Sequence, residues 1–303
     1  MLDVISIGHF AIDTIFLPER HEPFVVLGGP VTYVSFAARR VDACVSVVSK
    51  VGDDFPDAYV RWLERESVDL SGLTRIKDAE TTRFEIKYGS DLSSRSLRLK
   101  SKAPPITVDD LPYSLEAKAV HIAPIAGEVS HDVIEKLRYS TDVLTLDPQG
   151  ILRIFNEDGE VSYGSLIDKH ILNSVDVYKS SLDEIKATTG LSNLDLALRK
   201  VHDYGVKAVI VTLGTEGAVF SLEGSVHKVP AYKSERVVDP TGAGDVFMGS
   251  LLAEYIRGED PFWCACVGSA AASLIVETVG PTFSAGKSEI YRRARLLYEK
   301  ETK

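Results

Sequence analysis

The chain has 303 residues, of which 45% are hydrophobic and 26% charged, as in globular proteins with a large core. Its formal charge of −10 argues against nucleic acid or an anionic membrane as the main partner, because both bind basic surfaces. Three cysteines make no disulfide framework and no apolar run could span a bilayer, so we expect a cytoplasmic protein.

Short β-branched runs alternate with segments that carry apolar residues at helical spacing. The strands are predicted at 4–8, 44–50, 119–124, 142–148, 175–180 and 208–214. The helices are predicted at 30–40, 57–66, 130–139 and 193–204. This alternation predicts an α/β fold with a central, mostly parallel sheet flanked by helices, which binds ligands at the carboxyl ends of its strands.

Two segments depart from this rhythm. Residues 12–27 and 80–100 show strand-like alternation with turn residues and no helical pattern. We interpret them as a small β-sheet lid beside an α/β core made of 1–11, 28–79 and 101–303. The alternative is a pair of extra hairpins at the edge of the main sheet.

The stretch "RVVDPTGAGDVFMGS" (236–250) places Gly242, Ala243, Gly244 and the acid Asp245 at the start of a helical pattern. Backbone N–H groups of a Gly-rich turn at a helix N-terminus bind anions. A carboxylate there repels phosphate, but it can accept the proton of a hydroxyl that attacks the phosphate. The alternative is an ordinary helix cap after a Gly-rich turn.

Residues 239–245 ("DPTGAGD") match the C-terminal signature of the ribokinase-like PfkB family of carbohydrate kinases. The resemblance extends along nearly the whole chain and includes both lid segments. It implies ATP-dependent phosphorylation of a small polyhydroxylated substrate, with Mg²⁺ bridging the phosphates. It also implies that the backbone of Gly242, Ala243 and Gly244 forms an anion hole and that Asp245 is the catalytic base. Lid sheets of this family often pair between subunits, which suggests a homodimer.

Several segments supply candidate substrate ligands. "GHFAIDTIF" resembles the first strand of the family, whose Asp, here Asp13, binds substrate hydroxyls, and "GGPVTYVS" resembles its Gly-Gly signature. The Asn usual after that signature is replaced by a tyrosine. Together with Asp245, the candidate substrate ligands are Asp13, Gly28, Gly29, Tyr33, Arg83 on the lid hairpin and Gln149 in "LDPQG".

The donor side carries a second departure from the family pattern. "TLGTEGAVF" resembles the nucleotide-binding turn, whereas the Asn-x-x-Glu motif is changed to Ser-x-x-Glu. Besides Gly242 and Gly244, the candidate ATP contacts are Lys179, Ser181, Thr212, Gly214 and Gly217, with Glu184 near Mg²⁺ through water. In the family, the region that corresponds to residues 280–288 lies near the adenine and, in some members, near a monovalent cation, to which Asp239 and Thr241 would contribute carbonyl groups.

The motifs are compatible with polyols, sugars and nucleosides as substrates. The overall pattern is similar to archaeal myo-inositol kinases of the family, which makes myo-inositol the first expectation, followed by ribose-like or ketohexose sugars and then nucleosides. A nucleoside would need aromatic stacking, for which Phe10, Phe16, Tyr33 and Phe84 are available. From another class, the lost Asn fits a non-catalytic sugar or nucleotide sensor on a kinase fold.

Overall fold

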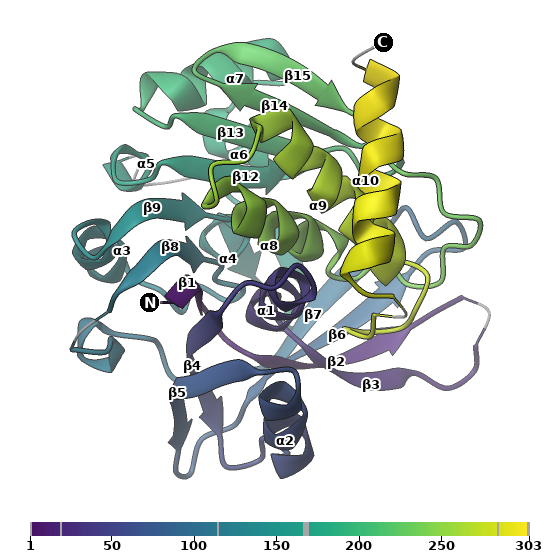
Figure 1. The fold of residues 1–303 in the computed structure, drawn as a ribbon. Helices are drawn as coiled ribbons and strands as arrows, with labels where there is room; N and C mark the ends of the chain where they lie inside the picture. The colour runs from purple at the N-terminus through teal and green to yellow at the C-terminus, as the bar shows by residue number, and fades with distance from the viewer. Residues whose placement is uncertain (1, 19, 114, 166–169, 284, 302–303) are drawn as a thin grey trace.

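A nine-stranded sheet forms the centre of the computed structural model, which describes residues 2–18, 20–113, 115–165, 170–283 and 285–301 (Figure 1). The strand order is β15-β14-β13-β12-β9-β8-β1-β4-β5, with antiparallel pairing only at β13–β14 and β14–β15. The strands are β1 (Leu2–Ile7), β4 (Val45–Gly52), β5 (Val68–Ile76), β8 (Ala117–Ile122), β9 (Thr141–Leu146), β12 (Val177–Ser181), β13 (Ala208–Thr212), β14 (Ala218–Leu222) and β15 (Ser225–Val229). The predicted α/β fold with a mostly parallel sheet is confirmed.

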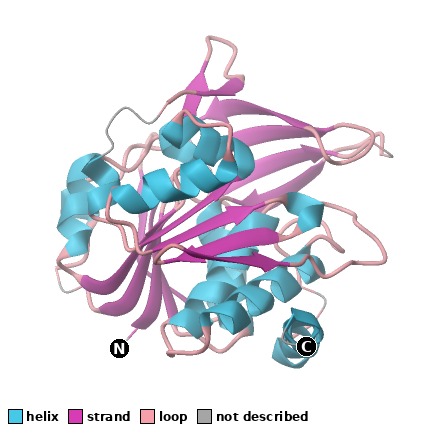
Figure 2. Cartoon of the chain, turned by 90° about the horizontal axis from the view of Figure 1, so that it is seen from above, coloured by secondary structure: helices cyan, strands magenta, loops and turns pink. Residues whose placement is uncertain are grey.

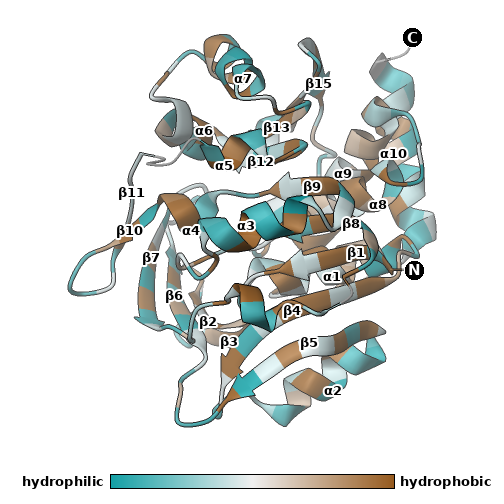
Figure 3. Cartoon of the chain, turned by 90° about the vertical axis from the view of Figure 1, so that its left-hand side faces the viewer, coloured by the Kyte–Doolittle hydropathy of each residue, from teal (hydrophilic) through white to brown (hydrophobic). Residues whose placement is uncertain are grey.

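Helices cover both faces of this sheet, and Figure 2 shows the strands between the two helical layers. One layer consists of α1 (Pro30–Arg40), α2 (Asp57–Arg65), α8 (Ala243–Tyr255), α9 (Pro261–Ile275) and α10 (Lys287–Glu301). The other consists of α3 (His131–Arg138), α5 (His170–Asn173), α6 (Leu182–Thr189) and α7 (Leu194–Asp203), and the short α4 (Gln149–Leu152) follows β9. In Figure 3 the central strands are mostly hydrophobic, whereas α3 alternates between both colours, as expected of an amphipathic helix.

The two segments predicted as a lid form a sheet of their own rather than extra edge strands of the large sheet. Its strand order is β3-β2-β6-β7, with β2 and β6 parallel and the other pairs antiparallel. The bounds are β2 (Ala11–Phe16), β3 (Phe24–Gly28), β6 (Thr82–Tyr88) and β7 (Arg95–Ser101). The strands therefore begin and end within one residue of the predicted segments or inside them.

A hairpin that was not predicted lies against this small sheet. It consists of β10 (Arg153–Phe155) and β11 (Val161–Tyr163). The Leu99 backbone N–H of β7 donates to the Gly159 carbonyl at 2.8 Å, and the backbones of Arg98 and Glu160 form an isolated antiparallel β-bridge. Figure 3 shows the hairpin beside β7. The segment after β9 thus covers the outer edge of the lid strand β7.

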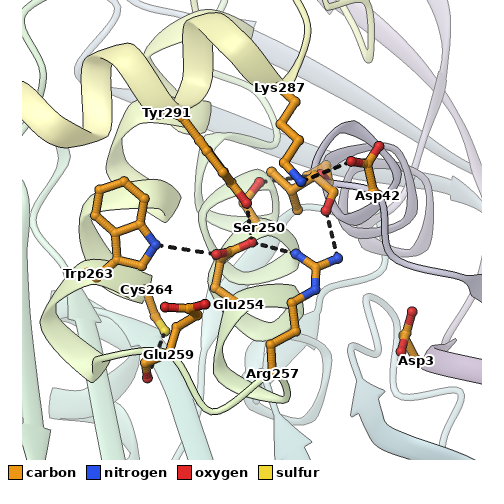
Figure 4. A network of polar contacts seen from close by, with 12 residues as sticks. Asp3, Asp42, Ser250, Glu254, Arg257, Glu259, Trp263, Cys264, Lys287 and Tyr291 are labelled. Atoms are coloured by element: carbon orange, nitrogen blue, oxygen red, sulfur yellow. Dashed lines mark hydrogen bonds and ion pairs between the residues drawn. The ribbon is translucent and has the colours of Figure 1, made fainter.

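A buried polar network holds the carboxyl end of α8 against its neighbours (Figure 4). Glu254, 2% exposed, accepts hydrogen bonds from Arg257 at 2.5 Å, the Trp263 indole at 3.3 Å and the Tyr291 hydroxyl at 2.7 Å. Arg257 also donates to the Val41 carbonyl at 2.7 Å. At ~1.5 Å per residue, Glu254 lies about 14 Å along the helix from Asp245. The network therefore joins four helices far from the Gly-rich turn.

Replacing Glu254 by Ala is expected to lower the free energy of unfolding by ~2–4 kcal/mol, because three donors lose a buried carboxylate. Urea denaturation measures this change. Lys287→Met is the matched control: it removes a neighbouring ion pair with Asp42 whose side chains are 39% and 72% exposed. We expect the control to change stability by ~0–1 kcal/mol. Equal effects of both substitutions would contradict a structural role for the network.

Candidate active site

The Gly-rich turn forms the N-terminus of α8 as predicted. Gly242 is the N-cap residue with φ +75°, a left-handed conformation that favours glycine, and Asp245 lies in the first turn. A Cβ on Gly242 would lie 2.3 Å from the Tyr33 ring, and one on Gly244 would lie 2.9 Å from the Lys179 ammonium. Gly244 has no positive φ, so its backbone conformation does not require glycine. The lack of a side chain there instead lets the Lys179 ammonium come close to the helix backbone.

Asp245 lies among charged groups at the carboxyl ends of the strands. Burial raises its pKa to about 6, and the charge of Lys179 opposes this shift. The Gln149 amide nitrogen lies 3.5 Å from Oδ1 of Asp245. A carboxyl group with this pKa is largely ionised at neutral pH and still basic enough to accept a proton, which suits a general base.

Lys179 on β12 forms a buried ion pair with Asp147, which follows β9. The ammonium lies 2.5 Å from Oδ2 of Asp147, and the two side chains are 6% and 1% exposed. Burial lowers the pKa of Lys179, but the charges of Asp147, Asp245 and Glu184 together outweigh this effect and raise it overall. Lys179 was predicted from the sequence as an ATP contact, whereas Asp147 was not predicted. The pair places a permanent positive charge at Gly244, beside the base.

Asp13 and Tyr33 bring unpaired polar atoms to the other side of the turn. Asp13 is 5% exposed, and a Cβ on Gly28 would lie 1.9 Å from its carboxylate. Burial raises the pKa of Asp13 to about 7, although Arg153 opposes this shift and the Gly29 N–H donates to the carboxylate. Within the described residues, Asp13 Oδ1 and Tyr33 Oη are buried without a hydrogen-bond partner. A ligand hydroxyl would satisfy both, since an unpaired buried polar group costs ~1–3 kcal/mol.

The arginines differ most from expectation. Arg83 was predicted to cover a substrate hydroxyl, but its guanidinium pairs with Asp54 at 2.5 Å. Arg153, which was not predicted, donates to Gln149 Oε1 at 2.7 Å and to the Ile125 carbonyl at 3.0 Å. It therefore holds the amide that faces Asp245. Arg95 on the lid was also not predicted and lies 3.5 Å from the Tyr88 hydroxyl.

The predicted donor residues lie at the ends of β12 and β13. Ser181 and Glu184 form a capping box at the start of α6: the Glu184 carboxylate accepts from the Ser181 N–H at 2.7 Å and the Ser181 hydroxyl accepts from the Glu184 N–H at 3.3 Å. The Ser181 hydroxyl keeps its own proton to donate, and the Tyr163 hydroxyl lies 3.4 Å from the other Glu184 oxygen.

The turn after β13 divides its two glycines between different environments. The Thr212 hydroxyl donates to the Ser180 carbonyl at 3.3 Å. Gly214 (φ +61°) faces open space, whereas a Cβ on Gly217 (φ +96°) would lie 2.1 Å from the Val229 carbonyl oxygen. Glycine is therefore required at position 217 because the end of β15 passes close to it. Gly214 has open space beside it and can face a ligand.

Two contacts tie the turn to the rest of the molecule. The Asp239 carboxylate accepts from the Thr241 N–H at 2.9 Å and the Gly280 N–H at 3.0 Å. The Tyr88 hydroxyl of the lid lies 2.8 Å from the Thr241 hydroxyl. The lid strand β6 thus reaches the residue directly before Gly242.

Over the part of the chain that the structure describes, no three His, Cys, Asp or Glu side chains form a metal-binding group. Mg²⁺ keeps several waters and is commonly held by one or two carboxylates and substrate phosphates. Glu184 and Asp147 both influence the pKa of Asp245, which places their carboxylates near the turn. This donor set fits a magnesium ion that is bound largely through phosphate and water. No described helix is long and apolar enough to cross a membrane.

Residues 1–287 match the pfkB family of carbohydrate kinases. The chain is 31% identical over 285 residues to the cytidine kinase of Thermococcus kodakarensis, covering 92% of this chain and 98% of that protein. It is 28% identical over 307 residues to the inositol 3-kinase of Arabidopsis thaliana, covering 96% and 80% of the two chains. Among solved structures, a pyrophosphate-dependent kinase in the ribokinase family superposes with a TM-score of 0.83 at 24% identity, covering 96% and 99% of the chains.

Proposed function

The chain belongs to the PfkB family of carbohydrate kinases, phosphotransferases with a hydroxyl acceptor, and we propose that it transfers the γ-phosphoryl group of ATP to a hydroxyl of myo-inositol. The observation that carries this proposal is the juxtaposition of the Asp245 carboxyl group with the Lys179 ammonium at the bare N-terminus of α8. It places a base and a positive charge beside an anion-binding backbone.

The reaction follows from these groups. Asp245 accepts the proton of the acceptor hydroxyl as its oxygen bonds to the γ-phosphorus and the bond to the β,γ-bridging oxygen breaks. The N–H groups of residues 242–244 and the Lys179 ammonium stabilise the negative charge on the transferring group. ADP leaves with the bridging oxygen. The lid excludes water from this step, which limits hydrolysis of ATP.

Magnesium would neutralise the β- and γ-phosphate oxygens when bound. Glu184 would orient its water ligands, with Ser181 donating its hydroxyl proton to phosphate. Gly214 and Thr212 would line the nucleotide site at the end of β13. A monovalent cation near the Asp239 and Thr241 carbonyls belongs to the same proposal.

The polar groups of the acceptor side support a polyol. Asp13 Oδ1 and Tyr33 Oη have no partner among the described residues and suit hydroxyl groups of a ring. Two of the four rings considered for stacking on a base already pack on other side chains: Phe10 packs on Phe55, and Phe84 lies under the Arg153 guanidinium. We therefore place myo-inositol first.

A nucleoside is the second candidate acceptor, because the chain is 31% identical to a cytidine kinase over almost its whole length. The two acceptors are separated by comparing kcat/KM for myo-inositol, cytidine, adenosine, fructose and ribose at saturating MgATP. We expect the highest value for myo-inositol. A tenfold advantage of any other acceptor, about 1.4 kcal/mol of transition-state preference, would replace this substrate and keep the kinase assignment. Ligand binding without any turnover would favour the sensor alternative.

The same assay tests the donor. ATP is the proposed donor, and pyrophosphate is measured beside it because the superposed kinase is pyrophosphate-dependent. Faster turnover with pyrophosphate would reassign the donor. Cys44, Cys264 and Cys266 form no disulfide among the described residues, which fits the cytoplasmic location that we propose.

A homodimer through the lid is also proposed. The edge strand β3 offers unpaired backbone groups, and Val25 on it is 60% exposed. Light scattering of the wild type and of Val25→Lys tests this contact. We expect a dimer for the wild type and a shift to monomer for the variant.

A further inference from the structure

The lid strand β7 directs one guanidinium toward the Gly-rich turn. Arg95 and Tyr88 are paired across β6 and β7, so their side chains lie on the same face of the lid. The Tyr88 hydroxyl lies 2.8 Å from the Thr241 hydroxyl, and Arg95 Nη1 lies 3.5 Å from the Tyr88 hydroxyl. Because Thr241 directly precedes Gly242, this face of the lid is turned toward the anion hole.

Arg95 has no direct acidic partner: among the residues that the structure describes, no carboxylate forms an ion pair within 4 Å of its guanidinium, whose one hydrogen bond goes to the Tyr88 hydroxyl. Burial lowers the pKa of Arg95, and the charges of Tyr88, Tyr163 and Glu184 together outweigh this effect and raise it overall. Burial raises the pKa of Asp13 and of Asp245, and Arg95 is among the charges that oppose both shifts. The charge of Arg95 therefore acts on both Asp13 and Asp245, and its guanidinium makes one hydrogen bond, to the Tyr88 hydroxyl, among the described residues.

Arg98 on the same strand provides a contrast. It lies three residues further along, so its side chain points to the opposite face, where it pairs with Glu160 at 3.2 Å. One arginine of β7 thus holds the β10–β11 hairpin, and the other faces the reaction site without an acidic partner.

We propose that Arg95 is a further catalytic residue, which binds the transferring phosphoryl group from the lid side. This inference rests on the proposed kinase function. As the acceptor oxygen bonds to the γ-phosphorus and the bridging oxygen leaves with ADP, negative charge spreads over three equatorial oxygens. Backbone N–H groups and Lys179 bind them from the α8 side. The planar guanidinium, which can donate two parallel hydrogen bonds, binds them from the other side.

Another assignment of the same guanidinium is recognition of an anionic group on the acceptor. The two assignments differ in kinetics: a contact made to the transferring group lowers kcat, whereas a contact made to the acceptor raises its KM. They also differ in nucleotide binding, because only the first one distinguishes ATP from ADP.

The experiment compares the wild type with Arg95→Met, Arg95→Lys and the matched control Arg98→Met. We expect Arg95→Met to lower kcat by ~10²–10³-fold with little change in the acceptor KM, and Arg95→Lys to retain part of the activity. Added guanidinium chloride at millimolar concentration should partly restore turnover of Arg95→Met. Arg98→Met should keep wild-type kcat, and thermal unfolding shows whether each variant is folded.

A second measurement needs no turnover. Arg95→Met should bind a non-hydrolysable ATP analogue at least ~10-fold more weakly while its affinity for ADP is unchanged, since only the analogue carries a γ-phosphate. If the wild type phosphorylates no acceptor, the proposed function fails, and this binding comparison still decides the role of Arg95. The inference is overturned by an unchanged kcat, by a rise in acceptor KM alone, or by equal losses of affinity for analogue and ADP.

Discussion

Replacing Asp245 by Asn is expected to lower kcat by ~10²–10⁴-fold, the usual effect of losing a general base. The amide preserves the shape of the side chain and its contact with the Gln149 amide region, but it cannot accept the hydroxyl proton. ATP affinity should be equal or higher, because a negative charge is removed from the phosphate site. Steady-state kinetics and calorimetric ATP titration give the two values. Near-wild-type turnover of the Asn variant would remove Asp245 from the mechanism.

The pH dependence of the wild type tests the same role. Burial raises the pKa of Asp245 to about 6, and only the ionised carboxylate can accept the proton. We therefore expect kcat/KM to fall below about pH 6 and to level off above it. Ionisation of Asp245 should raise activity but lower stability. A carboxyl pKa that is raised in the folded state means that ionisation destabilises this state, so the Asn variant should be at least as stable as the wild type at pH 8.

Elements with strong local signals were predicted well from the sequence. The helix at 30–40 begins with Pro30 after Gly29 and carries apolar residues at helical spacing, and its bounds agree with α1. Residues 209–211 are apolar and β-branched, as expected of the interior strand β13. In both segments the local pattern and the tertiary environment favour the same conformation.

Helices and strands without a clear local sequence pattern were not predicted. In α9 eleven of the fifteen residues are buried, so the helix shows no polar face that would reveal its period. β5 contains Gly72, where a Cβ would lie 2.4 Å from the Val47 carbonyl oxygen. This glycine interrupts the strand pattern in the sequence. The strands β10 and β11 have three residues each, too few for alternation to be recognised.

The active-site predictions divide in the same way. The Gly-rich turn, Asp245 and Lys179 lie in contiguous motifs and come together in the structure. Asp147 lies at the carboxyl end of the strand predicted at 142–148, and the rule that ligands bind at such ends could have identified it. Arg95 and Arg153 lie 58 residues apart and belong to no local motif. Arg95 is placed by its pairing with Tyr88 in the small sheet, and Arg153 by its contact with Gln149 from the start of the β10–β11 hairpin. Such long-range placement cannot be read from neighbouring residues.

The Ser-x-x-Glu segment shows how one motif supports two explanations. In the capping box at the N-terminus of α6, each side chain accepts a hydrogen bond from the backbone N–H of the other residue. This structural role alone explains the spacing of Ser181 and Glu184. Glu184 nevertheless influences the pKa of Asp245, so the same cap holds its carboxylate near the reaction site. Substitution of the family's Asn by Ser181 preserves this cap, because serine is also a preferred N-cap residue. The change therefore does not by itself favour a non-catalytic sensor.

Replacing Lys179 by Met is expected to have the second largest effect, on stability as well as turnover. It removes the ammonium beside Gly244 and leaves Asp147, 1% exposed, without its counter-charge. Loss of one partner of a buried ion pair lowers the free energy of unfolding by ~3–5 kcal/mol. Loss of a cation at the transferring phosphoryl group lowers kcat by ~10²–10³-fold. Urea denaturation and steady-state kinetics measure the two effects.

The double variant Lys179→Met, Asp147→Asn separates these effects. Removing both charges should restore most of the stability, because no unpaired buried ion remains, whereas kcat should stay low. The pH profile adds a third readout in the single variant. Burial raises the pKa of Asp245 and Lys179 opposes that shift, so without the ammonium the acid limb of kcat/KM should move above pH 6. If the double variant regains turnover together with stability, Lys179 serves only to neutralise Asp147, and the anion hole consists of the backbone of residues 242–244 alone.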